Sequence, residues 1–414
     1  MLAKKNRPLG ELAEKITVGY VGSMASEYVD NGIPFLRSLN VRPFLFDPSD
    51  LKFVTREFHE KIKKSAISPG DVVVVRTGKP GASCVVPDSL IEANCSDLVI
   101  IRCGENLDPY FVSYYINSIV GSQVKGQLVG AIQKHFNIGS AKEIVFPDID
   151  KSKQSEIARV LRAIDSKIDC NNRVNTELES MAKTLYDYWF SQFDFPDVNG
   201  NPYRFSGGRM DYNVILKREI PCGWTESSIL AVADLLGGGT PTKKKSEYWG
   251  GDIPFFTPTD ADGAIFKFLT ADSITLEGLK NSSTKLFGKH TIFITARGSV
   301  GKLVLAGIDM AMNQSCYALR AKSGVSHSFL FFLTKELVHH LQVKSSGSVF
   351  DSIVSNDIEL TKLAIPPIDL IERFSEFAEP VFEKIANNIK ENQQLTQLRD
   401  WLLPMLMTGQ VKVT

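Results

Sequence analysis

The ten residues Ser26-Glu-Tyr-Val-Asp-Asn-Gly-Ile-Pro-Phe35 recur without a gap as Ser246-Glu-Tyr-Trp-Gly-Gly-Asp-Ile-Pro-Phe255, at an offset of 220 positions. Shorter matches follow in the same order along the chain. They pair Val72–Val75 with Ile292–Ile294, Gly78–Gly81 with Gly298–Gly301, Asn94–Ser96 with Asn313–Ser315, and Phe146–Asp150 with Ile365–Asp369. Ordered matches whose offset drifts slowly predict a tandem duplication of about 200 residues.

Each half ends in a long helical pattern. Apolar or seam positions alternate three and four residues apart from Ile157 to Leu185 in the first half, and from Ile371 to Leu402 in the second. This alternation is typical of the seam of a coiled coil. The pattern therefore predicts one long helix at the end of each half.

Both seams are interrupted by two asparagines one turn apart, namely Asn171, Asn175, Asn388 and Asn392. A seam asparagine costs stability unless it finds a polar partner, so it fixes the register and orientation of a helix pair. Asparagines at equivalent places predict an antiparallel pair within one chain. Homodimerisation through the same seams is the main alternative, and two amphipathic helices packed on their own domains are another.

Prolines and aromatic residues mark the helix ends. Pro380 predicts a kink or a new start within the second helix, and Pro404 predicts its end. Aromatic residues gather where the first helix ends, and they form either a small core or part of a docking surface. These are Tyr188, Trp189, Phe190, Phe193 and Phe195.

The fold class predicted is α+β, with two repeated β-rich domains separated by two long helices in an antiparallel coiled coil. The mixed regions hold short β-branched runs and turn dipeptides, which are typical of such domains. The expected boundaries are 1–150 for the first domain, 151–190 for the first long helix, 191–215 for a connecting segment, 216–369 for the second domain, 370–405 for the second long helix and 406–414 for a tail.

The composition is that of an ordinary globular protein. Lysine and arginine number 47, as do aspartate and glutamate, which counts against a polycation that coats nucleic acid through charge alone, but not against basic groups placed in loops on one face. No apolar run is long enough to span a membrane, and the amino terminus lacks the apolar core of a signal peptide. The six cysteines form no CxxC pair, so reduced thiols in a cytoplasm are expected.

The sequence contains none of the common catalytic or metal-binding motifs. Walker A, HExxH, GxSxG and GxGxxG patterns are absent, as is the Asp/Asn-Pro-Pro-aromatic tetrapeptide of amino-methyltransferases. The six histidines are scattered, apart from the adjacent His339 and His340, which diverge on a helix. We therefore predict no catalytic residue and no metal ligand, and a binding scaffold is favoured over an enzyme.

Several stretches of the chain resemble the specificity (S) subunit of Type I restriction-modification enzymes. The resemblance extends over essentially the whole chain, although the first half has Gly19-Tyr-Val-Gly22 where the second has Gly238-Gly-Thr-Pro241. The stretches that carry it are Asp165–Ile168, Asn171–Leu178, Leu185–Phe190, Phe193–Pro196, Gly200–Tyr203, Ser206–Gly208, Ile220–Trp224, Gly238–Pro241, Tyr248–Trp249, Ile253–Phe255 and Leu402–Gly409.

This resemblance implies a non-catalytic subunit of a DNA-modifying complex in a bacterial or archaeal cytoplasm. Each half would be a target recognition domain that reads one part of a split DNA site in the major groove. The two helices would set the spacer and dock two methyltransferase (M) subunits, which methylate adenine N6, while two restriction/motor (R) subunits join for cleavage. S-adenosylmethionine, ATP and Mg would belong to these partners, and no cofactor to this chain.

Residues for contact with double-stranded DNA are predicted from loops that follow the repeated strands. Bases are read by arginine, lysine, asparagine or glutamine, and phosphates by basic and hydroxyl groups. The alternative for any one of them is a solvated loop charge. The candidates are Arg37, Asn40, Arg42, Arg76, Thr77, Lys79, Gln133, Lys134 and His135 in the first half, and Lys243, Lys244, Lys245, Tyr248, Thr257, Thr259, Arg297, Ser299 and Lys302 in the second.

Two functions of other classes stay open at this point. One is a duplicated enzyme whose active site uses no familiar motif, and turnover by the chain alone would support it. The other is a duplicated scaffold that joins two proteins without DNA. Sequence-specific DNA binding that weakens as salt rises would separate the S-subunit interpretation from this scaffold, because phosphate contacts release counterions.

Overall fold

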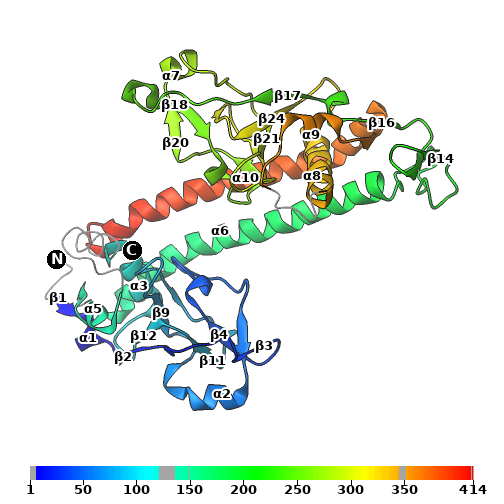
Figure 1. Ribbon diagram of the computed structural model, residues 1–414. Helices are drawn as coiled ribbons and strands as arrows, with labels where there is room; N and C mark the ends of the chain where they lie inside the picture. The colour runs from blue at the N-terminus through cyan, green and yellow to red at the C-terminus, as the bar shows by residue number, and fades with distance from the viewer. Residues whose placement is uncertain (1–5, 121–135, 148, 345–350, 412, 414) are drawn as a thin grey trace. The chain divides into compact units, whose positions relative to one another are not determined.

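A computed structural model describes residues 6–120, 136–147, 149–344, 351–411 and 413 of the chain (Figure 1). The chain divides into two compact units. The first unit lies within residues 1–169 and 393–414, and the second within residues 170–392. Among the described residues, no helix combines the length and the apolar character needed to cross a lipid bilayer.

The first unit is built on two sheets of short strands, with the strand orders β10-β9-β12-β2 and β3-β7-β4-β11-β8. β9 consists of four consecutive valines that are all buried, as expected for a strand covered on both faces. The strands are β1 Asn6–Pro8, β2 Lys15–Val18, β3 Tyr28–Val29, β4 Ile33–Leu36, β5 Val41–Arg42, β6 Leu45–Phe46, β7 Lys52–Val54, β8 Ala66–Ile67, β9 Val72–Val75, β10 Ser83–Val85, β11 Ala93–Cys95, β12 Leu98–Arg102 and β13 Val145–Pro147.

The second unit has sheets with the strand orders β17-β24-β21-β22-β19 and β20-β18-β23. A hairpin of β14 and β15 precedes them in the sequence. The strands are β14 Met210–Asn213, β15 Arg218–Pro221, β16 Thr225–Ser227, β17 Ala233–Gly237, β18 Trp249–Phe256, β19 Phe266–Lys267, β20 Asp272–Ile274, β21 Ile292–Thr295, β22 Leu303–Ala306, β23 Ala311–Met312, β24 Cys316–Ala321 and β25 Leu363–Ile365.

The two units repeat one strand topology. In the first, β12 lies antiparallel between β9 and β2, and β10 flanks β9. In the second, β24 lies in the same way between β21 and β17, and β22 flanks β21. The parallel pair β4–β11 matches the parallel pair β18–β23, and the antiparallel pair β1–β13 matches β16–β25. The predicted duplication is therefore present in the strand pairing.

One detail of the sequence alignment is corrected by the strand register. Asn94 lies opposite Phe35 in β11, whereas the residue opposite Phe255 in β23 is Ala311. Asn94 therefore corresponds to Ala311, and Asn313 to a residue two positions after Asn94. The loop before β24 is also one residue longer than the loop before β12, so the offset between the halves changes within this segment, which no local pattern reveals.

Helices connect these strands and complete both units. The α-helices are α1 Leu9–Leu12, α2 Arg56–Lys61, α3 Pro109–Tyr115, α5 Ile138–Lys142, α6 Lys151–Tyr186, α7 Leu276–Lys280, α8 His327–Lys344, α9 Ser355–Leu360 and α10 Ile368–Met407. Short 3-10 or π turns are η1 Ser38–Asn40, η2 Lys63–Ser65, η3 Ile116–Val120, η4 Asp187–Ser191, η5 Ile229–Ala231, η6 Ser246–Tyr248 and η7 Pro258–Asp260.

Within the second unit, α6 and α10 run antiparallel through their asparagines. Asn171 Nδ2 donates to Asn392 Oδ1 at 2.9 Å, and Asn388 Nδ2 donates to Asn175 Oδ1 at 2.8 Å. Asn171 and Asn388 are almost fully buried. Rising residue numbers in one helix thus meet falling numbers in the other, which confirms an antiparallel pair formed within one chain.

Within the first unit, the end of α10 contributes to the core. Leu403, Leu406 and Met407 are buried with Ile157 and Leu161 of α6. The helix therefore continues through Pro404 to Met407, and the prediction that Pro404 ends it is wrong. A proline inside a helix costs about 3 kcal/mol, and burial of three apolar side chains in the last turn offsets that cost.

The prediction of a fresh helix start at Pro380 is also wrong, because α10 is one continuous helix from Ile368 to Met407. Pro380 lies on its exposed side, while Ala378 and Phe382 on either side of it are buried. Of the five aromatic residues at the end of α6, three form part of a core, whereas Tyr188 is 37% exposed. Trp189, Phe190 and Phe193 are at most 4% exposed and belong to the main apolar cluster of the second unit.

Candidate nucleic-acid interface

Several strands of the second unit end together. Paired residues at these ends are Gly237 with Tyr317, Thr295 with Cys316, and Phe256 with Met312. Four loops consequently leave the sheets at one place. We call residues 238–242, 257–260, 297–301 and 313–315 the second loop edge.

Backbone contacts hold the four loops of the second loop edge together. Gly239 N donates to the carbonyl oxygen of Met312 at 3.0 Å, and Arg297 N donates to that of Ser315 at 3.2 Å. A Cβ at Gly298 would lie 3.6 Å from Cβ of Pro258. Gly298 has a φ of 83°, a left-handed conformation that favours glycine. Residues far apart in the sequence are thus held on one rigid edge.

The first unit has the same arrangement, formed by residues 19–22, 37–40, 76–81 and 96–97, which we call the first loop edge. β2, β4, β9 and β11 end there, since Val75 pairs with Leu98 and Leu36 with Cys95. Tyr20 N donates to the Cys95 carbonyl oxygen at 2.8 Å, as Gly239 does to that of Met312. Most of the predicted DNA contacts therefore lie on, or directly beside, two equivalent edges.

Two polar residues at these edges form hydrogen bonds to the backbone of their own turns. Asn40 is fully buried, accepts a hydrogen bond from Arg37 N at 3.0 Å and donates to the carbonyl oxygens of Asp47 and Ser49. In the second unit, Asp260 accepts from Thr257 N at 2.8 Å in the same way. Because the Asn40 amide is consumed in holding its own turn, its burial argues against the predicted contact with DNA.

Arginines beside Asn40 form ion pairs. Arg37 lies 2.7 Å from Asp50, and Arg42 lies 2.5 Å from Asp47. Hydrogen bonds from Lys52 and Arg37 lower the pKa of Asp50 to about 2, so this carboxylate stays charged at neutral pH. Arg42 is 64% exposed and more accessible than Arg37.

The turn after β9 carries a third group of candidates. Arg76 pairs with Asp97 and also donates from Nε to the Phe136 carbonyl oxygen at 3.3 Å. Thr77 is half-buried, and Lys79 at the tip is exposed. The remaining first-half candidates, Gln133, Lys134 and His135, lie outside the described residues.

Three lysines follow the first loop of the second loop edge. Lys243 and Lys244 are exposed, and Lys245 Nζ donates to Tyr248 Oη at 2.9 Å. This hydrogen bond raises the pKa of Lys245, which keeps it cationic. Tyr248 is only 5% exposed, so its ring supports the loop while the lysines face solvent.

The other candidates of the second unit differ in availability. Thr257 Oγ1 is within 2.8 Å of Asp260 and 2.7 Å of Thr259 Oγ1, so the two hydroxyls are hydrogen-bonded to the turn itself. Lys302 Nζ donates to the Ala261 carbonyl oxygen at 2.9 Å. Arg297 and Ser299 are exposed, and among the described residues the Arg297 guanidinium has no hydrogen bond or ion pair. Arg297 is therefore the most available cation of this edge.

The sequence reasoning missed Gln314. This exposed residue lies at the tip of the 313–315 loop and accepts a hydrogen bond from Thr240 Oγ1 across the second loop edge. The available signal is its place in a short polar run, Asn313 to Ser315, between two apolar stretches. Its pairing with Thr240, 74 positions away, depends on tertiary structure.

A possible cation site was also not foreseen. His59, Glu60 and Glu92 bring their ligand atoms within 4.8 Å of one another. Arg56 donates to both oxygens of Glu92, and Lys63 pairs with Glu60 at 3.0 Å. Asn94 Nδ2 donates to His59 Nδ1 at 3.1 Å, since its Oδ1 accepts from Ser65; His59 Nε2 then donates to Glu92. These partners already satisfy the groups that a metal would need.

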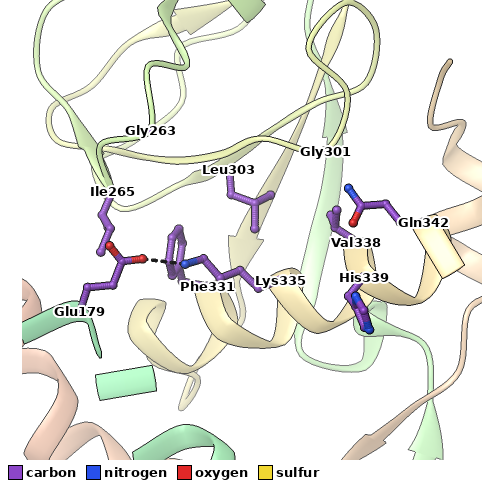
Figure 2. Close-up of a pocket in the computed structure, with 10 residues that line it drawn as sticks. All are labelled: Glu179, Gly263, Ile265, Gly301, Leu303, Phe331, Lys335, Val338, His339 and Gln342. Carbon is purple, nitrogen blue, oxygen red and sulfur yellow. Dashed lines mark hydrogen bonds and ion pairs between the residues drawn. The ribbon is translucent and has the colours of Figure 1, made fainter. Parts of the chain in front are cut away.

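A hollow of about 200 Å³ lies between α8, the end of α6 and the β22 region of the second unit (Figure 2). Lys335 Nζ lies 2.7 Å from Glu179 and 4.9 Å from the centroid of the Phe331 ring. Figure 2 shows this ion pair at one end of the hollow and His339 at the other. The Lys335–Glu179 ion pair links α8 to α6 at this hollow.

Comparison with known proteins gives consistent matches. Residues 221–397 match the family model described as the Type I restriction modification DNA specificity domain. The chain is 26% identical over 307 residues to the MjaIX Type I restriction enzyme specificity subunit of Methanocaldococcus jannaschii, covering 73% of this chain and 67% of that protein. It is 23% identical over 313 residues to the HindI Type I restriction enzyme specificity subunit of Haemophilus influenzae, covering 63% and 68%.

A solved structure shares the fold. The S subunit of the Type-I restriction-modification system from M. genitalium aligns with a TM-score of 0.56 and 14% identity, over 97% of this chain and 95% of that one.

Proposed function

We propose that this chain, which belongs to the specificity subunits of Type I restriction-modification enzymes, reads a split DNA site, with one part for each unit. The first loop edge would contact one part and the second loop edge the other, in the major groove. The observation that carries the proposal is the repetition of this edge. Two edges of one topology, furnished with different side chains, suit a reader of two different half-sequences.

The side chains of the edges fit a DNA partner. Positive charge for contact with phosphates would come from the exposed residues Lys79, Lys243, Lys244 and Arg297. The whole chain is balanced at 47 basic and 47 acidic residues. Base edges require forked or amide side chains, and arginine and glutamine are present on the edges. These side chains provide cationic and amide groups on or beside both edges.

The helix pair would set the spacer between the two parts. Two modules reach major grooves on one face of DNA only at separations that suit the helical repeat of about 34 Å. The four seam asparagines would hold this length by preventing the helices from sliding, since a shifted register leaves buried amides unpaired. The proposal includes docking of two M subunits and two R subunits, which would hold S-adenosylmethionine, ATP and Mg, while this chain itself is not catalytic.

Co-expression of the full chain with the neighbouring methyltransferase gene tests this function. N6-methyladenine in the host DNA is then mapped by long-read sequencing. A split motif with a modified adenine in each part and a fixed gap supports the proposal. No methylation, with no complex on a sizing column, would favour a protein scaffold without DNA.

Deleting about one heptad from α6 tests the spacer role. Both half-sites should be kept while the gap between them changes or methylation is lost. An unchanged gap with full methylation would refute the helix pair as the spacer.

A further inference from the structure

We infer that Gln314 reads an A·T base pair in the second part of the DNA site and that Thr240 positions it. This inference rests on the proposed function and names a specificity-determining residue within it. Gln314 is exposed on the second loop edge, where Thr240 Oγ1 donates a hydrogen bond to its Oε1. The two residues are 74 positions apart in the sequence and meet only in the tertiary structure.

The backbone on both sides of Gln314 is fixed. Asn313 N donates to the Phe256 carbonyl oxygen at 3.0 Å, and Asn313 Oδ1 accepts from Ser315 N at 3.0 Å. The Ser315 carbonyl oxygen accepts from Ala296 N at 2.9 Å and Arg297 N at 3.2 Å. A side chain that recognises a base must be held in place before binding, and this loop holds Gln314 by its neighbours.

The hydrogen bond from Thr240 also orients the amide group. With one lone pair of Oε1 engaged by the hydroxyl, the two Nε2 hydrogens point away from Thr240. The second lone pair of Oε1 remains available. An amide presented in this way can donate to adenine N7 and accept from adenine N6, the bidentate contact that distinguishes an A·T pair in the major groove. The adenine so read differs from the one that is methylated, which must leave the base stack.

The residues of the first loop edge that correspond to Thr240 and Gln314 differ from them. Gly19 approaches the Ser96 carbonyl oxygen as Gly238 approaches that of Asn313, so that Val21 corresponds to Thr240. Asp97 in the first loop edge is engaged by Arg76. The loop that follows the parallel strand pair thus carries an aspartate engaged by Arg76, from the turn after β9, in the first unit, and a glutamine engaged by Thr240, from the loop after β17, in the second. Such a difference is expected if this loop reads a different base in each half-site.

The test uses variants of the full chain, each co-expressed with the methyltransferase. For each variant, genomic sites are sorted by the base at each motif position, and the methylated fraction is measured for each base. Gln314→Ala should lower the preference for A·T over other base pairs at one position of the second part by about 5- to 150-fold, which is the discrimination that one bidentate contact gives. The first part should be unchanged. Gln314→Glu should shift that position towards C·G, because a carboxylate accepts from cytosine N4.

Thr240→Val and Thr240→Ser test the positioning role. The valine variant should partly relax the same position, and the serine variant should keep wild-type preference because it retains the hydroxyl. Gln192→Ala, which removes an exposed glutamine outside the edge, is the matched control and should leave the motif unchanged.

The outcomes separate this inference from the proposed function. An unchanged motif in Gln314→Ala overturns the role of Gln314 while the function stands. A wild-type complex that methylates no split motif overturns the function itself. If Gln314→Ala abolishes methylation, the binding of wild-type and variant complexes is compared on duplexes that carry each of the four base pairs at each motif position. A loss confined to the A·T duplex supports the inference, and an equal loss for all four refutes it.

Discussion

The hydrogen bond between Asn388 and Asn175 allows a quantitative test of the helix register. Asn388 is 2% exposed, and its Nδ2 donates to Asn175 Oδ1 at 2.8 Å. Removing either amide deletes a hydrogen bond with a net value of about 0.5–1.5 kcal/mol and leaves its partner unpaired, at about 1–3 kcal/mol when buried. Asn388→Ala and Asn175→Ala should therefore each lower the free energy of unfolding by about 1–3 kcal/mol.

The double variant should lose less than the sum of the two single variants. Once one amide is gone, the other has no partner to lose, so the coupling energy should be about 1 kcal/mol or more. Urea unfolding of the full chain, followed by tryptophan fluorescence, measures it. The buried Trp189 and Trp224 report on the second unit, which contains the asparagine pair.

A matched control uses Thr176, which is exposed beside Asn175 and donates to the Asn172 carbonyl oxygen of its own helix. Thr176→Ala combined with Asn388→Ala should be additive within about 0.5 kcal/mol. No coupling between Asn388 and Asn175 would refute the hydrogen bond. Coupling between Asn175 and Asn392 instead would indicate a register shifted by about one turn.

Three further predictions concern stability, pH and DNA binding. Phe374→Ala should cost about 3–5 kcal/mol in urea unfolding, because this ring is fully buried against Phe190 and Trp189, whereas Phe377→Ala, at a 58% exposed ring, should cost far less. Burial, followed by the stacked His327, lowers the pKa of His290 from 6.5 to about 4, so the unfolded chain binds this proton more tightly. The urea midpoint of the wild type should therefore fall as pH drops from about 6.5 towards 4. The midpoint of His290→Asn should fall less, and asparagine tolerates the φ of 70° at this position. An equal fall in both proteins would exclude His290 as the cause. Lys244→Ala should weaken binding to all DNA sequences and reduce the slope of log affinity against log salt by about 1, while exposed Lys384→Ala on α10 should leave the slope unchanged; identical slopes in the two variants would count against a phosphate contact at Lys244.

The sequence was sufficient to predict features that depend on local repetition. The duplication was visible because equivalent strands and turns keep their order, and β4 and β18 lie where the repeated Ile-Pro-Phe stretches predicted them. The long helices were visible because a seam needs an apolar or asparagine side chain every three or four residues. Most candidate DNA contacts lie on or beside the two loop edges, since glycine turns and strand ends leave local marks in the sequence; their contact with DNA stays a prediction.

Tertiary structure decided the features that depend on distant partners. Asn40 is buried because its amide completes a turn closed by Asp47 and Ser49, which its polar character did not indicate. α10 passes Pro404 because its last turn enters the core of the first unit, a contact with residues more than 200 positions earlier. Gln314 meets Thr240 only because β17 and β24 are paired. Periodicity therefore determined which elements form, whereas side-chain burial and strand pairing determined which polar groups stay exposed on the loop edges.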